Sequence, residues 1–118
     1  MNGYVNINIG GKDRGFKLGL YVLSEVINEL DINVIDIDSS LEKNPIKGVA
    51  LLMFHAGSYN CLRANEACDF TVMDVYDWID NEPNGLQSEA VQKFITAFYE
   101  SMSRDVPKDK EPGKKKND

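Results

Sequence analysis

Histidine is almost absent from this chain of 118 residues, and its scarcity limits the chemistry available. Any imidazole-based catalysis or zinc binding would depend on His55. Cys61 lies six residues further along the same predicted helix, about 600° round its axis, so the two side chains point to different faces. With Cys68 they make three candidate soft ligands without a recognised metal-binding spacing. We therefore predict a core or boundary histidine, two small buried thiols, no metal site and no cofactor.

Cysteine is also scarce, which excludes a disulfide scaffold and favours a reducing compartment. No apolar run approaches the roughly 20 residues needed to cross a bilayer. The N-terminus alternates polar and apolar residues from the start, unlike a signal peptide. These features predict a protein of the cytoplasm that does not span a membrane.

Basic residues are few in most of the chain. Residues 1–103 contain 15 Asp and Glu against 7 Lys and Arg, a balance of −8, and residues 104–118 carry +2, giving −6 in total. The acidic part excludes general binding of nucleic acid and docking on anionic lipid, because both need a basic surface. The length and a hydrophobic content of 42% fit one compact domain, predicted over 1–103. The charged remainder, 104–118, is predicted to be disordered.

The first third of the chain predicts a β-hairpin. In residues 5–9 the apolar side chains alternate with asparagines, as in a strand with one apolar face. Gly10-Gly11-Lys12 supplies a reversal, and residues 14–18 can return as the partner strand. The β-branched residues of 33–37 favour a third strand. The predicted fold is α+β and mainly helical, with an N-terminal antiparallel hairpin packed against about four helices.

Apolar spacing and capping signals place these helices. The first is predicted over Leu20–Leu30. Asn44 and Pro45 start the second, which extends to Arg63 and is apolar on nearly every side, as expected of a central buried helix. The last, over 86–103, carries an apolar stripe at helical spacing, with Glu89 and Lys93 as an i,i+4 pair on its exposed side.

The third helix has the clearest start signal in the chain. Thr71 and Asp74 form the pattern of a capping box, and Phe70 is placed to pack against Val75 as a hydrophobic staple. Pro83 and the residues after it end the helix. The acidic residues around it are interpreted as a solvated face, because nothing in the sequence predicts a pocket that would perturb their pKa values.

Catalytic and ligand-binding patterns are not found. The glycines at 10, 11 and 15 match neither phosphate-binding motif and precede a strand, so a hairpin turn is the better interpretation. Residues 36–40 imitate a calcium loop, but Leu41 stands where glycine is needed and Lys47 where the bidentate glutamate belongs. No nucleophile has an evident base beside it. An enzyme using His55 with Cys61 or a carboxylate would require the fold to join distant residues, so we predict no enzymatic activity.

The apolar stripe of the last helix admits two interpretations. The first is a surface that faces the core. The second is that part of the stripe stays open as a groove for an apolar partner helix. The candidate partner-binding residues are Tyr76, Phe94, Ile95, Phe98, Tyr99 and Met102.

The order of these elements resembles the small tail assembly chaperones of long-tailed bacteriophages, over about residues 4–103. Members of that family open with an alternating strand, a G-K turn and a second strand that continues into a helix, as residues 5–12 and 15–20 do here. Residues 51–56 resemble the family's buried helix. Residues 71–80 resemble its short acidic helix with a V-x-x-W-I core, and the helix with Phe94 and Phe98 matches its last ordered element. Residues 32–38 match nothing in it, and neither does the tetrapeptide 54–57, although it overlaps the end of that buried helix.

The resemblance implies a non-enzymatic chaperone in the cytoplasm of a bacterial host. Its partner would be the long, apolar, helical tape-measure protein, kept soluble while tail-tube subunits polymerise around it. The tail-tube protein is then a second candidate partner, and the sequence leaves self-association open. Family members are often made in two lengths by frameshifting. The lysines of 113–116 are consistent with a slippery run of adenines, or with an ordinary charged tail.

An alternative from another class is a small regulatory or inhibitor protein. Its acidic surface would mimic nucleic acid or occupy a basic partner. The balance of −8 over residues 1–103 favours this alternative, although it does not require the aromatic residues of the last helix.

Overall fold

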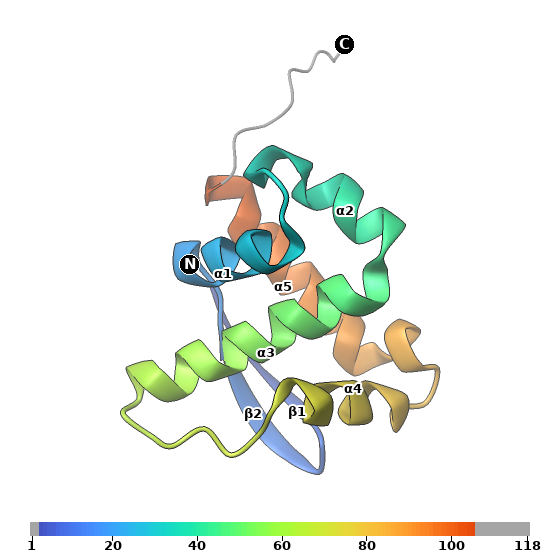
Figure 1. Ribbon diagram of the computed structural model, residues 1–118. Coiled ribbons are helices and arrows are strands. Elements are labelled where there is room, and N and C mark those ends of the chain that lie inside the picture. Colours follow the sequence, from blue (N-terminus) through green and yellow to red (C-terminus); the bar gives the residue numbers. More distant parts are fainter. Residues whose placement is uncertain (1–2, 106–118) are drawn as a thin grey trace.

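The N-terminal residues form the predicted hairpin, and helices follow to the end of the described chain. The computed structural model describes residues 3–105 (Figure 1). Its elements are β1 (Tyr4–Ile9), β2 (Lys12–Lys17), α1 (Leu20–Leu30), the 3-10 turn η1 (Val34–Asp36), α2 (Ile37–Lys43), α3 (Pro45–Arg63), α4 (Val72–Asp80), the 3-10 turn η2 (Gly85–Gln87) and α5 (Glu89–Asp105). The α+β, mainly helical class is therefore confirmed.

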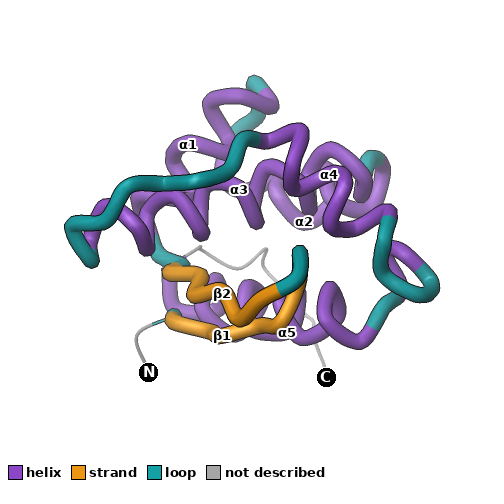
Figure 2. Tube along the Cα trace, turned by 90° about the horizontal axis from the view of Figure 1, so that it is seen from below, coloured by secondary structure: helices purple, strands orange, loops and turns teal. Residues whose placement is uncertain are grey.

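The hairpin turns through Gly10 and Gly11, which both adopt positive φ, at 66° and 87°. Two such residues suit the two-residue turn that matches the twist of the strands. The antiparallel register pairs Val5 with Phe16 and Ile7 with Arg14. Strand β2 packs on α3 and β1 on α5, so the hairpin lies between these two helices (Figure 2).

Helix α3 is the central buried helix, as predicted. It crosses the middle of the molecule and contacts β2, α1, α2 and α4 (Figure 1). From Gly48 to Gly57 every side chain is buried apart from the half-buried Phe54. Pro45 occupies its first turn and Asn44 its N-cap position, although the Asn44 side chain makes no capping hydrogen bond.

The predicted start of α4 is confirmed in detail. The Thr71 hydroxyl accepts a hydrogen bond from the Asp74 amide at 3.3 Å, and the Thr71 amide donates to Asp74 Oδ2 at 2.8 Å. The ring of Phe70 lies against that of Trp78, with 5.0 Å between the ring centroids. The contact of Phe70 with Val75 stays a prediction.

The third strand predicted near 33–37 is wrong. Residues Val34–Asp36 form a 3-10 turn, and Ile37 begins α2. Ile37 and Leu41 are one helical turn apart and both are buried, in a helix that packs on α3. Burying this i,i+4 pair outweighs the local alternation of apolar and acidic residues, so the described chain has five α-helices rather than about four.

The last helix begins later and ends later than predicted. Residues Gly85–Gln87 form a 3-10 turn, and the Ser88 hydroxyl then accepts from the Val91 amide at 3.2 Å, which caps α5. The helix extends to Asp105, two residues past the predicted domain end at 103. The rest of the predicted disordered tail, 106–118, lies outside the described residues, and so does the lysine run.

None of the described helices has both the length and the apolar character needed to span a membrane.

Candidate partner-binding site

The apolar stripe of α5 mostly faces the core. Phe94 and Phe98 are 0% and 4% exposed, and the Phe94 ring meets Phe16 edge to face with 5.4 Å between centroids. Neither ring is therefore accessible to a partner, which corrects the prediction for these two residues. The remaining candidates are half-buried and pack against the core: Tyr76, Ile95, Tyr99 and Met102. Partner contact by these four stays a prediction.

Tyr99 has a structural role that the sequence did not indicate. Its hydroxyl donates a hydrogen bond to Asp38 Oδ1 at 2.8 Å and thereby connects α5 to α2. Burial, this hydrogen bond and the negative charges of Asp38 and Glu42 raise the pKa of Tyr99 to about 12. The phenol is therefore held in its neutral form, which can donate to the carboxylate.

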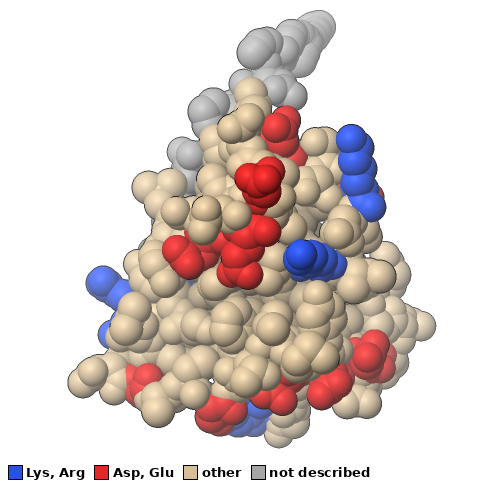
Figure 3. Space-filling view, in the orientation of Figure 1, with Lys and Arg blue, Asp and Glu red and all other residues tan. Residues whose placement is uncertain are grey.

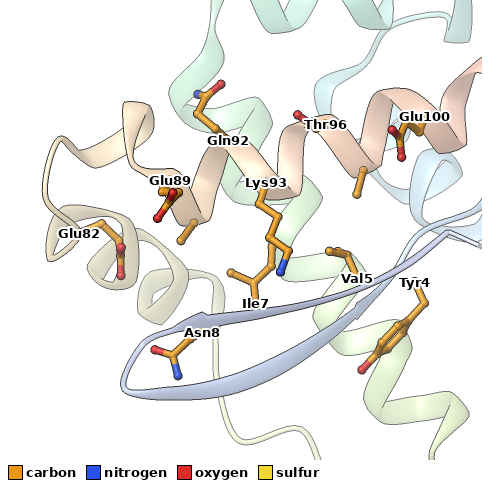
Figure 4. Close-up of a pocket in the computed structure, with 12 residues that line it drawn as sticks. Tyr4, Val5, Ile7, Asn8, Glu82, Glu89, Gln92, Lys93, Thr96 and Glu100 are labelled. Atoms are coloured by element: carbon orange, nitrogen blue, oxygen red, sulfur yellow. The ribbon is translucent and has the colours of Figure 1, made fainter.

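An open groove lies on the neighbouring face of α5, where this helix passes β1 (Figure 4). The groove encloses about 900 Å³. Residues of both β1 and α5 line it, together with Glu82 from the segment after α4: Tyr4, Val5, Ile7, Asn8, Glu82, Glu89, Ala90, Gln92, Lys93, Thr96, Ala97 and Glu100. Enclosed pockets bury most of a small ligand, whereas this groove is open along its length and suits part of a larger partner. We call it the β1–α5 groove.

The groove has apolar walls and a charged rim. Val5 on β1 and Ala90 on α5 are half-buried and give the groove its accessible apolar surface, whereas Ile7 and Ala97 are buried and form its floor. Three glutamates and one lysine surround this surface, and Lys93 extends across the groove toward β1 (Figure 4). The arrangement exposes apolar surface within an acidic border.

Strand β1 also contributes an unpaired edge. Within the described residues the sheet has two strands, so β1 has β2 on one side and no strand on the other. No residue of β2 lines the groove, which places the groove beside the unpaired edge. An open strand edge presents backbone N–H and C=O groups that another chain can bind.

The sequence contained only a weak signal for this groove. Ala90 and Ala97 are seven residues apart and so lie on one side of the helix. Glu89 and Lys93 were predicted to lie on the exposed side, and both line the groove. The sequence pattern could not show that the hairpin would cover one side of α5 and stop beside these alanines, because that depends on tertiary packing.

The single histidine is buried at the boundary between α1 and α3, as predicted. His55 is 9% exposed, and its Nε2 pairs with the Glu29 carboxylate. The fold thus joins His55 to a distant carboxylate but not to Cys61. Neither His55 nor Glu29 lines the β1–α5 groove. The pair connects α1 to α3.

The two thiols are less buried than predicted. Cys61 is half-buried and Cys68 is exposed, so the expectation of two buried thiols is wrong for Cys68. Within residues 3–105, no group of three or more His, Cys, Asp or Glu side chains is placed to hold a metal ion.

On one face, acidic side chains gather at the upper centre and along the lower edge (Figure 3).

Comparison with protein-family models, with curated proteins and with solved structures gave no match to this chain.

Proposed function

We propose that this protein is a non-enzymatic assembly chaperone that shelters an apolar segment of another polypeptide in the β1–α5 groove. The observation that carries the proposal is the groove itself, an open space of about 900 Å³ in which the half-buried Val5 and Ala90 expose apolar surface next to an unpaired strand edge. A protein that folds for its own stability alone would be expected to fill this space with larger side chains than Ala90 and Ala97.

The proposed partner is a long apolar helix. The resemblance to tail assembly chaperones of long-tailed bacteriophages supports the tape-measure protein as that partner, in the cytoplasm of the bacterial host. An amphipathic or apolar helix can bind such a groove through side chains spaced at i, i+3, i+4 and i+7. The acidic rim and the net charge of −6 would keep the complex dispersed while the apolar surface is covered.

The direct test is co-expression with a candidate tape-measure protein, followed by measurement of how much of that protein stays soluble. Thr96 is exposed and lines the groove, so Thr96→Trp should fill part of it. We expect this variant to weaken binding about tenfold or more, a loss of about 1.4 kcal/mol.

The matched control is Met73→Trp, on α4. Met73 is 64% exposed and does not line the groove, so this variant should rescue the partner as well as the unchanged protein does. The proposal fails if the unchanged protein does not keep the partner soluble, or if Thr96→Trp rescues it equally well.

The acidic inhibitor remains a second candidate because three glutamates and one lysine border the groove. Binding of a basic partner by charge would weaken steeply as salt is added. Lys93→Glu distinguishes the two functions, because the added negative charge should strengthen binding of a basic partner and should not strengthen burial of an apolar helix. Binding that does not depend on salt would count against the inhibitor.

A further inference from the structure

The two thiols of the chain lie together at the C-terminal end of α3. Cys61 is in the last turns of the helix, and Cys68 is in the connection to α4. Both line a pocket of about 260 Å³, which we call the thiol pocket, together with Tyr21, Ser58, Tyr59, Leu62 and Glu66. Cys68 Sγ lies 3.7 Å from the Ser58 hydroxyl. Ser58 is one helical turn before Cys61, so Cys68 lies over the side of α3 that carries both residues.

The backbone conformation at the C-terminal end of α3 explains why Cys68 lies over this side of the helix. Asn65 adopts the left-handed conformation, with φ of 59°. Its amide donates to the Leu62 carbonyl at 3.1 Å, and the Glu66 amide donates to the Cys61 carbonyl at 2.9 Å. These two hydrogen bonds make a Schellman motif, which turns the chain sharply at the helix end. Cys68 Sγ also donates to the Phe70 carbonyl at 3.7 Å, which fixes its position after the turn.

The two sulfur atoms differ in accessibility and in charge environment. Cys68 is exposed, whereas Cys61 is half-buried. Burial, a hydrogen bond and charge interaction with Cys68, and the carboxylates of Glu66 and Asp69 raise the pKa of the Cys61 thiol. An oxidant from solution would therefore reach Cys68 first, with Cys61 held beside it as a protonated thiol.

We propose that Cys61 and Cys68 are a redox modification site, which closes to a reversible intramolecular disulfide when a peroxide is present. The Cys68 thiolate attacks one peroxide oxygen, the O–O bond breaks, and the leaving hydroxide takes a proton to become water. The Cys61 sulfur then attacks the sulfenic acid sulfur, the S–O bond breaks, and a second water leaves with the Cys61 proton. Both thiols together lose two electrons, and hydrogen peroxide gains them. A dithiol reductant reverses the reaction by exchange.

The disulfide would restrict the segment between α3 and α4, which is paired to the hairpin through Asp69. Asp69 follows Cys68 directly, and its carboxylate pairs with Lys12 at 3.1 Å and with Arg14 at 3.7 Å. Bonding Cys68 to α3 would restrict the movement of Asp69 and so favour these two ion pairs. Oxidation is thereby coupled to the turn of the hairpin.

The test treats the purified full chain with hydrogen peroxide and then measures intact mass and thiol labelling by a maleimide. We expect the unchanged protein to lose the mass of two hydrogen atoms and both labelling sites, and to regain them with dithiothreitol. In Cys61→Ser, Cys68 should instead gain oxygen. In Cys68→Ser the sulfenic acid that Cys61 attacks cannot form. Oxidation of Cys61 should therefore slow by at least about tenfold.

Circular dichroism of both serine variants checks that they are folded. The proposal is overturned if the unchanged protein gains oxygen on Cys68 while Cys61 stays labelled, or if the main product is a disulfide between two chains. It is also overturned if Cys61 is oxidised equally fast in Cys68→Ser. None of these results depends on what the β1–α5 groove binds.

Discussion

The guanidinium of Arg14 lies over the indole of Trp78, with Cζ 3.9 Å from the ring centroid. The same side chain donates to the carbonyl oxygens of Ile9 at 2.9 Å and Gly10 at 3.1 Å, and pairs with Asp69. The Arg14 side chain is 14% exposed, whereas its ion-pair partner Asp69 is 61% exposed, so the contact with Trp78 is better shielded from water than the ion pair. One arginine on β2 therefore connects the turn of the hairpin with α4 and with the segment before it.

Removing this side chain should destabilise the domain. Arg14→Ala removes the cation–π contact and the hydrogen bonds to the turn, and we expect a loss of about 2 kcal/mol in the free energy of unfolding, measured with urea. Arg14→Lys keeps the charge near Asp69 but lacks the planar group, so it should recover less than half of the loss. Full recovery by lysine would show that the charge alone matters.

Gly10 and Gly11 offer a matched pair for testing how closely the turn approaches Trp78. Both have positive φ, so alanine should cost about 1–2 kcal/mol at either position. A Cβ at residue 10 would lie 2.6 Å from the indole of Trp78, whereas a Cβ at residue 11 would meet nothing within 4 Å. We expect Gly10→Ala to cost a further 1–3 kcal/mol or so, and to shift the tryptophan fluorescence. Equal losses for both variants would contradict this packing.

Phe94 should be important for folding and not for direct partner contact. Phe94→Ala opens a cavity beside Phe16, and we expect a loss of about 3–5 kcal/mol, measured by thermal or urea unfolding. Ile95→Ala, at the half-buried neighbouring position, should cost about half as much or less. If Phe94→Ala folds with nearly unchanged stability, the assignment of Phe94 to the core is wrong.

Tyr99 should make stability fall at alkaline pH. Its pKa is raised from 10.0 to about 12 in the folded chain, so the folded state retains a proton that the unfolded state releases. The stabilisation is complete below pH 10 and is lost as the pH rises to about 12. Tyr99→Phe has no such proton, so the difference in unfolding free energy between the two proteins should shrink over this interval. A difference that stays constant would show that the pKa of Tyr99 is not raised.

Local signals were sufficient for most elements of the fold. The alternation before Gly10 predicted β1, and Thr71 with Asp74 predicted the start of α4 because a capping box acts within one turn. Residues 33–37 were misassigned because the burial of Ile37 against other helices is not a local property. The position of Cys68 was missed for a related reason, since Asn65 closes α3 where a glycine would have been the more familiar signal.

The candidate residues predicted on α5 include Phe94 and Phe98, which the structure buries, whereas the groove proposed here lies on another face of the same helix. Phe94 and Phe98 are large and apolar, which suits a partner-binding surface in the sequence, but the same properties place both rings in the core. The groove depends on Ala90 and Ala97, whose small side chains give almost no sequence signal. The groove is a space between β1 and α5, so it can be located only when the packing of these two elements is known.

The contact between β1 and α5 joins the first element of the described chain to the last. During synthesis on a ribosome, Phe94 can therefore cover Phe16 only after α5 has emerged. Until then, the face of the hairpin that carries Phe16 lacks this cover. A nascent chain that stalls before residue 89 would leave that apolar face uncovered and would be a target for cellular proteases.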